Sequence, residues 1–185
     1  MSEPRDEFVS LSDPRALRAL AHPTRLKLVG LLRQEGPATA TQLGERLGES
    51  AASCSFHLRQ LAKWGLVADA GGGKGRNRPW RATAGVTRWE VRTQELAEAA
   101  ALFSAALAER YLEQLLAWFE RMPTEPPAWR EAQHIGDTQL SLTADQLDEL
   151  GKGVWRLIES FQGKQRPGAR RVTFLYAAFP APDTG

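Results

Sequence analysis

Two short helical segments separated by a glycine turn constrain the fold of this chain more than any other feature. Thr39-Ala-Thr-Gln42 fits a capping box, which predicts a helix over residues 40–47. Gly48 supplies a residue suited to a left-handed turn, and Ser50 is a good N-cap for a second helix over residues 51–64. Two short helices joined by so tight a turn predict a helix-turn-helix.

The segment before this motif predicts two more helices that complete a small core. Asp13-Pro14 has the form of an N-cap followed by proline at the first helical position, and it predicts a helix over residues 14–21. A second helix over residues 23–35 places apolar residues at helical spacing. In the helix after the glycine turn, Cys54, Leu58 and Leu61 fall on one face and are expected to point into the same core.

The opposite face of that helix has the composition of a DNA-reading surface. The major groove is about 12 Å wide and admits one helix, whose first residues must be short for the backbone to approach the bases. Ser53 and Ser55 can bond base edges or phosphates, Phe56 can touch a thymine methyl, and the cations farther along suit phosphates. The candidate DNA-binding residues here are Thr41, Gln42, Ser50, Ala51, Ala52, Ser53, Ser55, Phe56, Arg59 and Lys63.

A basic, glycine-rich hairpin follows. Expected strands over residues 66–70 and 79–83 flank the sequence GGGKGRNR, whose Lys74, Arg76 and Arg78 can reach the DNA backbone or minor groove. Asp69 is the only acid between residues 50 and 85. A nucleotide-binding phosphate loop is not favoured, because no Gly-Lys-Ser/Thr sequence follows and the loop leads into a strand.

Three separated stretches together resemble the winged helix of ArsR-type (ArsR/SmtB-like) transcriptional regulators. They are Leu-Ala-His-Pro-Thr-Arg-Leu at 20–26, Ser-Phe-His-Leu at 55–58 and Gly-Leu-Val at 65–67. The resemblance covers roughly residues 12–84. It implies a homodimer that binds double-stranded operator DNA and usually represses transcription.

The metal-sensing motifs of that family are missing. Residues 43–47 contain no cysteine, and residues 93–122 contain no His, Cys or Asp. The three histidines, His22, His57 and His134, are interpreted as structural. We therefore expect no metal site, no cofactor and no response to metal ions.

The remaining function classes are also constrained. No nucleophile and base, paired carboxylates or cofactor motif stands out, so an enzyme is not expected. No stretch approaches the ~20 apolar residues that span a bilayer. The polar start MSEPRDEF is not a secretory signal, and the lone Cys54 fits a reducing compartment, so we expect a cytoplasmic protein without membrane contacts.

The expected fold class is mainly α with a small β component (α+β). Residues 1–10 are expected to be a disordered tail, 11–85 the winged helix-turn-helix, and 86–122 a long dimerisation helix. Its helical part, residues 93–122, would be about 45 Å long, too long for so small a domain to cover, so a partner helix is expected. Residues 123–137 are expected to be a linker. Residues 138–185 are expected to form a strand-helix-strand segment with strands near 139–142 and 171–179.

Two alternatives stay open at this point. Trp129, Trp155 and Tyr176 are candidates to line a pocket for a small-molecule effector, although aromatic core or dimer interface is the simpler interpretation. The chain as a whole can also be a winged-helix protein-interaction module of a larger complex. The basic hairpin favours DNA over that second alternative.

Overall fold

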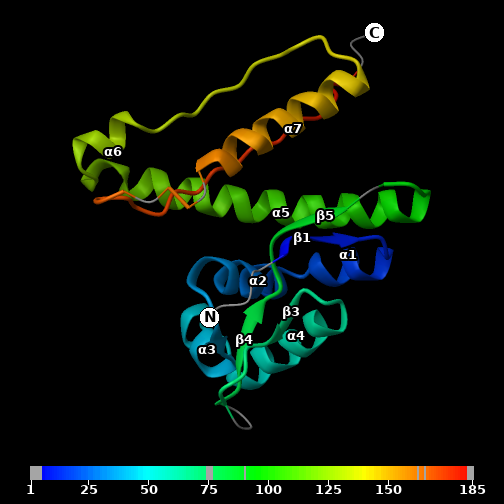
Figure 1. The fold of residues 1–185 in the computed structure, drawn as a ribbon, viewed down its shortest axis with the longest axis vertical. Helices are drawn as coiled ribbons and strands as arrows, with labels where there is room; N and C mark the ends of the chain where they lie inside the picture. The colour runs from blue at the N-terminus through cyan, green and yellow to red at the C-terminus, as the bar shows by residue number, and fades with distance from the viewer. Residues whose placement is uncertain (1–5, 74–76, 90, 162, 165, 183–185) are drawn as a thin grey trace. The chain divides into compact units, whose positions relative to one another are not determined.

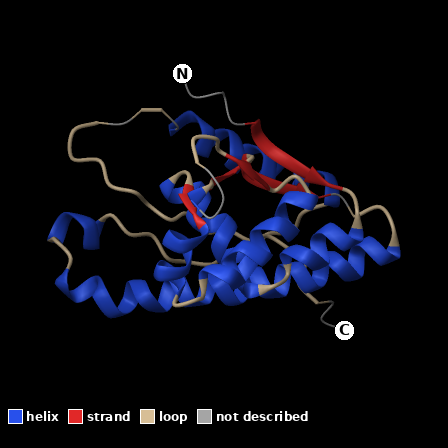
Figure 2. Cartoon of the chain, turned by 90° about the horizontal axis from the view of Figure 1, so that it is seen from below, coloured by secondary structure: helices blue, strands red, loops and turns tan. Residues whose placement is uncertain are grey.

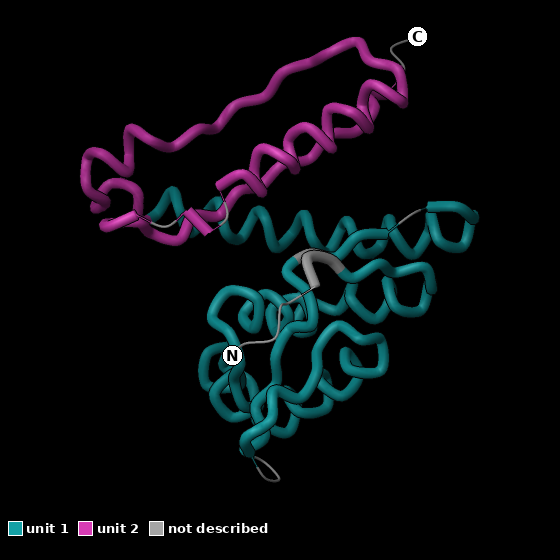
Figure 3. The backbone as a smooth tube through the Cα atoms, viewed as in Figure 1, with its two compact units in different colours: residues 1–120 teal, residues 121–185 magenta. Residues whose placement is uncertain are grey.

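Helices make up most of the chain, and within the described residues the strands lie before residue 90 (Figures 1 and 2). The computed structural model describes residues 6–73, 77–89, 91–161, 163–164 and 166–182. The chain divides into unit 1, residues 1–120, and unit 2, residues 121–185 (Figure 3). The predicted α+β class, mainly helical with a small sheet, is confirmed.

The four predicted N-terminal helices are confirmed almost to the residue. They are α1 (Pro14–Leu20), α2 (Pro23–Glu35), α3 (Ala40–Leu47) and α4 (Ala51–Lys63). Each begins at a side chain that accepts a hydrogen bond from the backbone of its own first turn. The four N-caps are Asp13, His22, Thr39 and Ser50.

The turn between α3 and α4 is defined by local chemistry. The Thr39 backbone N–H donates to Gln42 Oε1 at 2.9 Å, and the Gln42 backbone N–H donates to Thr39 Oγ1 at 3.2 Å, which completes the capping box. Gly48 adopts φ 68°, a left-handed conformation that a residue with a side chain rarely takes. Ser50 Oγ then accepts the Ser53 N–H at 3.0 Å and starts α4.

The hairpin that follows α4 belongs to a three-stranded antiparallel sheet. Strand β4 (Pro79–Ala82) lies between β2 (Ala38–Thr39) and β3 (Val67–Asp69). The predicted strand pair is confirmed, with Val67 opposite Ala82 and Asp69 opposite Trp80. The short strand β2 was not predicted. It links the start of α3 to the hairpin of β3 and β4, which we call the wing.

The prediction of a disordered tail is wrong for residues 6–10. These residues belong to β1 (Asp6–Leu11), which pairs in parallel with β5 (Ala84–Trp89). Residues 86–89, grouped with the long helix by the sequence, therefore lie in a strand. Leu11 is buried and Val9 packs against the core, so burial and a remote partner strand order this segment. Residues 1–5 of the expected tail lie outside the described residues.

The core of unit 1 is built mainly from leucines of α1, α2, α3 and α4. Its fully buried members include Leu17, Leu20, Leu28, Leu32, Leu43, Leu58, Leu61 and Leu66. The first half of α5 (Gln94–Arg121) adds Leu96, Ala99 and Phe103 to it. The predicted long helix is confirmed.

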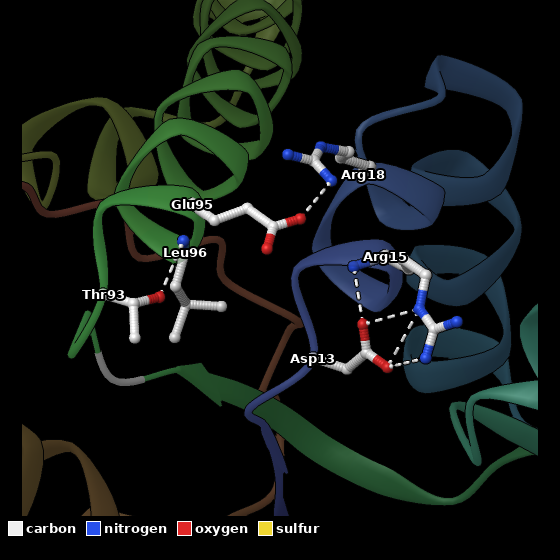
Figure 4. A network of polar contacts seen from close by, with 6 residues as sticks. All are labelled: Asp13, Arg15, Arg18, Thr93, Glu95 and Leu96. Carbon is white, nitrogen blue, oxygen red and sulfur yellow. Dashed lines mark hydrogen bonds and ion pairs between the residues drawn. The ribbon is translucent and has the colours of Figure 1, made fainter.

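Figure 4 shows the polar contacts around the start of α5, one of which joins it to α1. Arg18 of α1 donates to Glu95 at 3.0 Å, and Thr93 Oγ1 accepts the backbone N–H of Leu96 at 3.2 Å. The ion pair is exposed and contributes little, so the buried apolar side chains carry most of the attachment.

In its described residues, unit 2 contains the helices η2 (Met122–Thr124), α6 (Pro127–Glu131) and α7 (Ala144–Phe161). The predicted strands over 139–142 and 171–179 are wrong, because both segments lack regular secondary structure. A strand requires a hydrogen-bonded neighbour, and alternating apolar residues do not supply one. The expected linker holds the two short helices η2 and α6.

A charged cluster orders the part of unit 2 around Glu125. Arg170 donates two hydrogen bonds to its carboxylate at 2.7 and 3.2 Å, and Arg121 pairs with it at 3.3 Å. These contacts, the Arg170 bond above all, lower the pKa of Glu125. In the described part of the chain, no helix is long and apolar enough to cross a membrane.

The pairing of β1 can be tested with two adjacent substitutions. Val9→Asp should lower the free energy of unfolding by about 1–2 kcal/mol, because it places a carboxylate against the core. Ser10→Asp, at an exposed position of the same strand, should change it by less than about 0.5 kcal/mol. Urea unfolding measures both. Equal and negligible effects would restore the disordered-tail interpretation.

Candidate nucleic-acid interface

Helix α4 has two sharply different faces. Cys54, Leu58 and Leu61 are 0% exposed and seat the helix in the core of unit 1. The other face leaves Phe56, Arg59 and Lys63 exposed, and Phe56 keeps 49% of its surface despite being aromatic. Ala51 and Ala52 are exposed at the start of the helix, where no long side chain stands in front of the backbone.

Several of the predicted DNA-binding residues also have a structural task. The side-chain oxygens of Ser50 and Gln42 accept backbone N–H groups at the N-termini of α4 and α3. The Ser50 hydroxyl and the Gln42 amide group keep their own donors for contacts with DNA. Ser55 Oγ accepts a long hydrogen bond of 3.4 Å from Arg59 Nη1. Thr41 is exposed on α3, and Ser53 is half-buried on α4.

The wing is less positive than its sequence indicates. Arg78 forms an ion pair with Asp69 across the hairpin, and Asp69 Oδ1 also accepts the backbone N–H of Gly71 at 2.9 Å. One carboxylate therefore orders the turn and offsets one of the expected phosphate-binding cations. Sequence reasoning identified Asp69 as the only acid of the region but not its partner. Lys74 and Arg76 lie outside the described residues.

A cluster that sequence reasoning missed connects α4 to the start of α2. Arg25 Nε donates to His57 Nδ1 at 3.3 Å, and Arg25 Nη1 donates to the Ala19 carbonyl at 2.9 Å. The rings of His22 and His57 lie 4.5 Å apart. Burial first, then the charges of His22 and Arg25, lower the pKa of His57, so this cluster favours a neutral imidazole.

Cys54 lies one helical turn before His57 but is not arranged as a nucleophile. Burial first, and the charge of Glu49 second, raise the pKa of its thiol. A thiol with a raised pKa is a weak nucleophile, and Cys54 acts as a small core residue. Among the described residues, no three or more His, Cys, Asp or Glu side chains lie together in a group that could hold a metal ion.

The aromatic residues proposed to line an effector pocket belong to unit 2. The guanidinium of Arg170 lies over the ring of Trp129, 4.8 Å from its centroid. Tyr176 contacts Phe174, with ring centroids 6.1 Å apart. Trp155 is on α7. These contacts do not define a cavity, and the pocket of Trp129, Trp155 and Tyr176 stays a prediction.

Residues 20–69 match the family model of a helix-turn-helix domain. The matched range contains α2, α3, α4 and β3. It therefore includes α4, with its exposed polar face, and helices that pack against its buried face. The match supports a DNA-binding transcription regulator. No curated protein matches the chain.

Two solved structures show weak similarity to this domain and the regions around it. One is a mutant of Lactococcus lactis ZitR in its apo form, with 16% identity and a TM-score of 0.31 over 77% of this chain and 84% of that chain. The other is a mutant of S. aureus MepR bound to an oligodeoxyribonucleotide. It has 15% identity and a TM-score of 0.29 over 80% of this chain and 88% of that chain.

The histidine cluster predicts a stability loss in mild acid. The pKa of His57 is lower in the folded than in the unfolded protein, so the unfolded state binds more protons as the pH falls. Stability should be complete above the unfolded pKa of about 6.5 and decline as the pH falls through the lower folded pKa. Melting temperatures measured between pH 8 and 5 test this.

Two histidine variants make the pH test specific. His57→Gln should flatten the decline, because it removes the titrating imidazole at α4. His134→Gln, at an exposed position of unit 2, should leave the decline unchanged. A decline of equal size in the His57 variant would assign the acid sensitivity to other groups.

Proposed function

We propose that this chain is a sequence-specific double-stranded DNA-binding transcriptional regulator of the ArsR type. The observation that carries the proposal is the exposed polar face of α4, with short side chains at its start, in a matched helix-turn-helix domain. The protein acts in the cytoplasm as a homodimer, without catalysis and without responding to metal ions. It represses transcription by occupying its operator.

The two halves of the surface have different roles in this proposal. The start of α4, with Ser53, Ser55 and Phe56, enters the major groove and contacts base edges. Arg59 and Lys63, on later turns of α4, bind phosphates and set the orientation of the helix. The wing adds further phosphate contacts, reduced at Arg78 by the pairing with Asp69.

Exposed apolar surface on α5 supports the homodimer. One face of its first half is buried in unit 1, but Leu112, Leu116 and Phe119 on its second half are 56%, 51% and 42% exposed. A long helix with such a surface is stabilised by the same helix of a second copy. A dimer also presents two copies of α4 to half-sites about one helical turn of DNA apart.

A small-molecule effector, bound near Trp129, Trp155 and Tyr176, remains part of this proposal. Such an effector would explain why the chain has a second unit with several aromatic residues, since a minimal winged helix does not need that unit. The alternative function is a protein-interaction module. The pairing of Arg78 with Asp69 favours it, because it reduces the positive charge that a DNA-binding hairpin needs, and exposed Phe56 is compatible with it.

The DNA-binding proposal predicts distinct effects from α4 and from the wing. Ser53→Glu should weaken binding to the selected operator by about tenfold or more and change base preference, because it places a carboxylate at the groove floor. Ser141→Glu adds the same charge at an exposed position of unit 2 and should have no effect. Binding-site selection followed by fluorescence anisotropy measures both.

The wing variants separate charge from sequence reading. Asp69→Asn releases Arg78 while keeping an acceptor for the Gly71 N–H, so it should strengthen binding to specific and random DNA alike. The slope of log affinity against log salt should steepen by up to about 0.9 per subunit. Arg78→Ala should not steepen it. If neither the Ser53 nor the Asp69 variant alters DNA affinity, the interaction-module alternative is favoured.

The homodimer predicts a mass of about twice 20.4 kDa by light scattering at micromolar concentration. Leu116→Glu should shift the protein toward the monomer, because it charges the exposed apolar surface of α5. Phe56→Glu is a matched control, since this residue is similarly exposed but lies on the DNA-facing side of α4. A monomeric parent protein would contradict the dimer.

A further inference from the structure

Two partly buried arginines meet where α2, β5 and α5 come together in unit 1. Arg33, near the end of α2, reaches toward β5. Its Nε donates to the Ala84 carbonyl at 2.9 Å, and its Nη2 donates to Thr87 Oγ1 at 2.7 Å. Arg33 therefore keeps Nη1 as a donor group that none of these bonds uses.

Arg110 of α5 approaches the same face of α2. Its guanidinium lies directly on Gly30, one helical turn before Arg33, and a Cβ at residue 30 would overlap it. The absence of a side chain at Gly30 is what leaves room for this cation. Because residues 30 and 33 are neighbours on the helix surface, the two guanidinium groups face the same region.

The two cations are not neutralised where they meet. Burial first, then the charge of Arg110, lower the pKa of Arg33 to about 10. Burial also lowers the pKa of Arg110, and the charges of Tyr111 and Glu113 offset part of this effect. Among the described residues, neither arginine forms an ion pair with a carboxylate, and the nearby Glu113 is paired with Lys27 at 3.3 Å. Two adjacent, partly desolvated positive charges are unfavourable unless an anion joins them.

Arg33 does not line the small hollow that lies next to Arg110. This hollow has a volume of about 20 Å³, far smaller than the roughly 300–1,000 Å³ of a drug-sized pocket. It is lined by Pro23, Leu26, Lys27, Ala106, Glu109, Arg110 and Glu113. Glu109 and Glu113 place two carboxylates at its rim, so an anion is disfavoured inside this hollow and has to lie on the side of the Arg110 guanidinium that faces Arg33. No nitrogen of Arg110 is buried without a hydrogen-bond partner, so its unused donors remain open to solvent.

We propose that Arg33 and Arg110 form a binding site for a small oxyanion, the carboxylate or phosphate group of a small molecule. Guanidinium groups recognise both chemistries by paired N–H donors in a planar fork. An anion between them would join α2, the strand that follows the wing sheet, and the long helix α5. This site stands independently of the proposed DNA-binding function.

The experiment titrates the intact protein with sodium phosphate and, separately, with sodium acetate, replacing chloride at constant ionic strength. The Nε–Hε resonances of ¹⁵N-labelled arginines report on the site. We expect saturable shifts at Arg33 and Arg110 with at least one of the two anions. The arm that saturates at the lower concentration identifies phosphate or carboxylate as the preferred group. The melting temperature should rise and level off over the same range.

Matched variants make the result specific. Arg110→Gln should weaken the binding at least about tenfold, because it removes a charged fork. Gly30→Ala favours the helix but displaces the Arg110 guanidinium, so it should lose anion binding while the protein stays folded. Arg156→Gln, at an exposed position of α7, should bind as the parent does.

Two outcomes would overturn the proposal. The first is the absence of saturable shifts at Arg33 and Arg110 in the parent protein with both anions. This includes the case in which a carboxylate of a second copy already occupies the pair. The second is unchanged binding in both the Arg110 and the Gly30 variants, which would place the anion elsewhere. DNA affinity enters neither criterion, so failure of this site and failure of the proposed function are distinguishable.

Discussion

The burial of one face of α4 is the constraint on which the rest of the structure depends. Cys54, Leu58 and Leu61 are fully enclosed, so the rotation of this helix about its axis is fixed. A helix whose inner face is close-packed has one orientation available to its outer face. The exposed positions of Phe56, Arg59 and Lys63 follow from the leucines beneath them. The position of the surface proposed to bind DNA therefore depends on the packing of the core.

The parts of the fold that sequence could predict are those defined by neighbours in the chain. The capping box of Thr39 and Gln42, the left-handed Gly48 and the N-cap Ser50 each need only residues within one turn. For this reason the boundaries of α3 and α4 were predictable from the sequence. The matched helix-turn-helix domain lies over the same local motifs.

The parts that sequence could not predict depend on pairings between distant residues. Strand β1 has no local pattern that identifies β5 as its partner. Residues 171–179 have a strand pattern but no hydrogen-bonded partner strand among the residues that the structure describes. Composition counts Arg78 as a free cation, because only the hairpin register shows that Asp69 reaches it. The meeting of Arg33 and Arg110 likewise depends on where α5 passes Gly30. Charge and periodicity can be obtained from the local sequence, whereas each of these features is a contact between two residues that are distant in the chain.

The parallel pairing of β1 with β5 also has a consequence for the order of folding. Residue 6 lies opposite residue 84, so β1 has no partner until the chain has been made beyond the wing. The leucine core, by contrast, takes most of its members from residues 17–67. Contacts between near residues form before those that close a long loop. During synthesis the helix-turn-helix core can therefore assemble first, and the N-terminal strand, although it is the first segment made, joins the structure among the last.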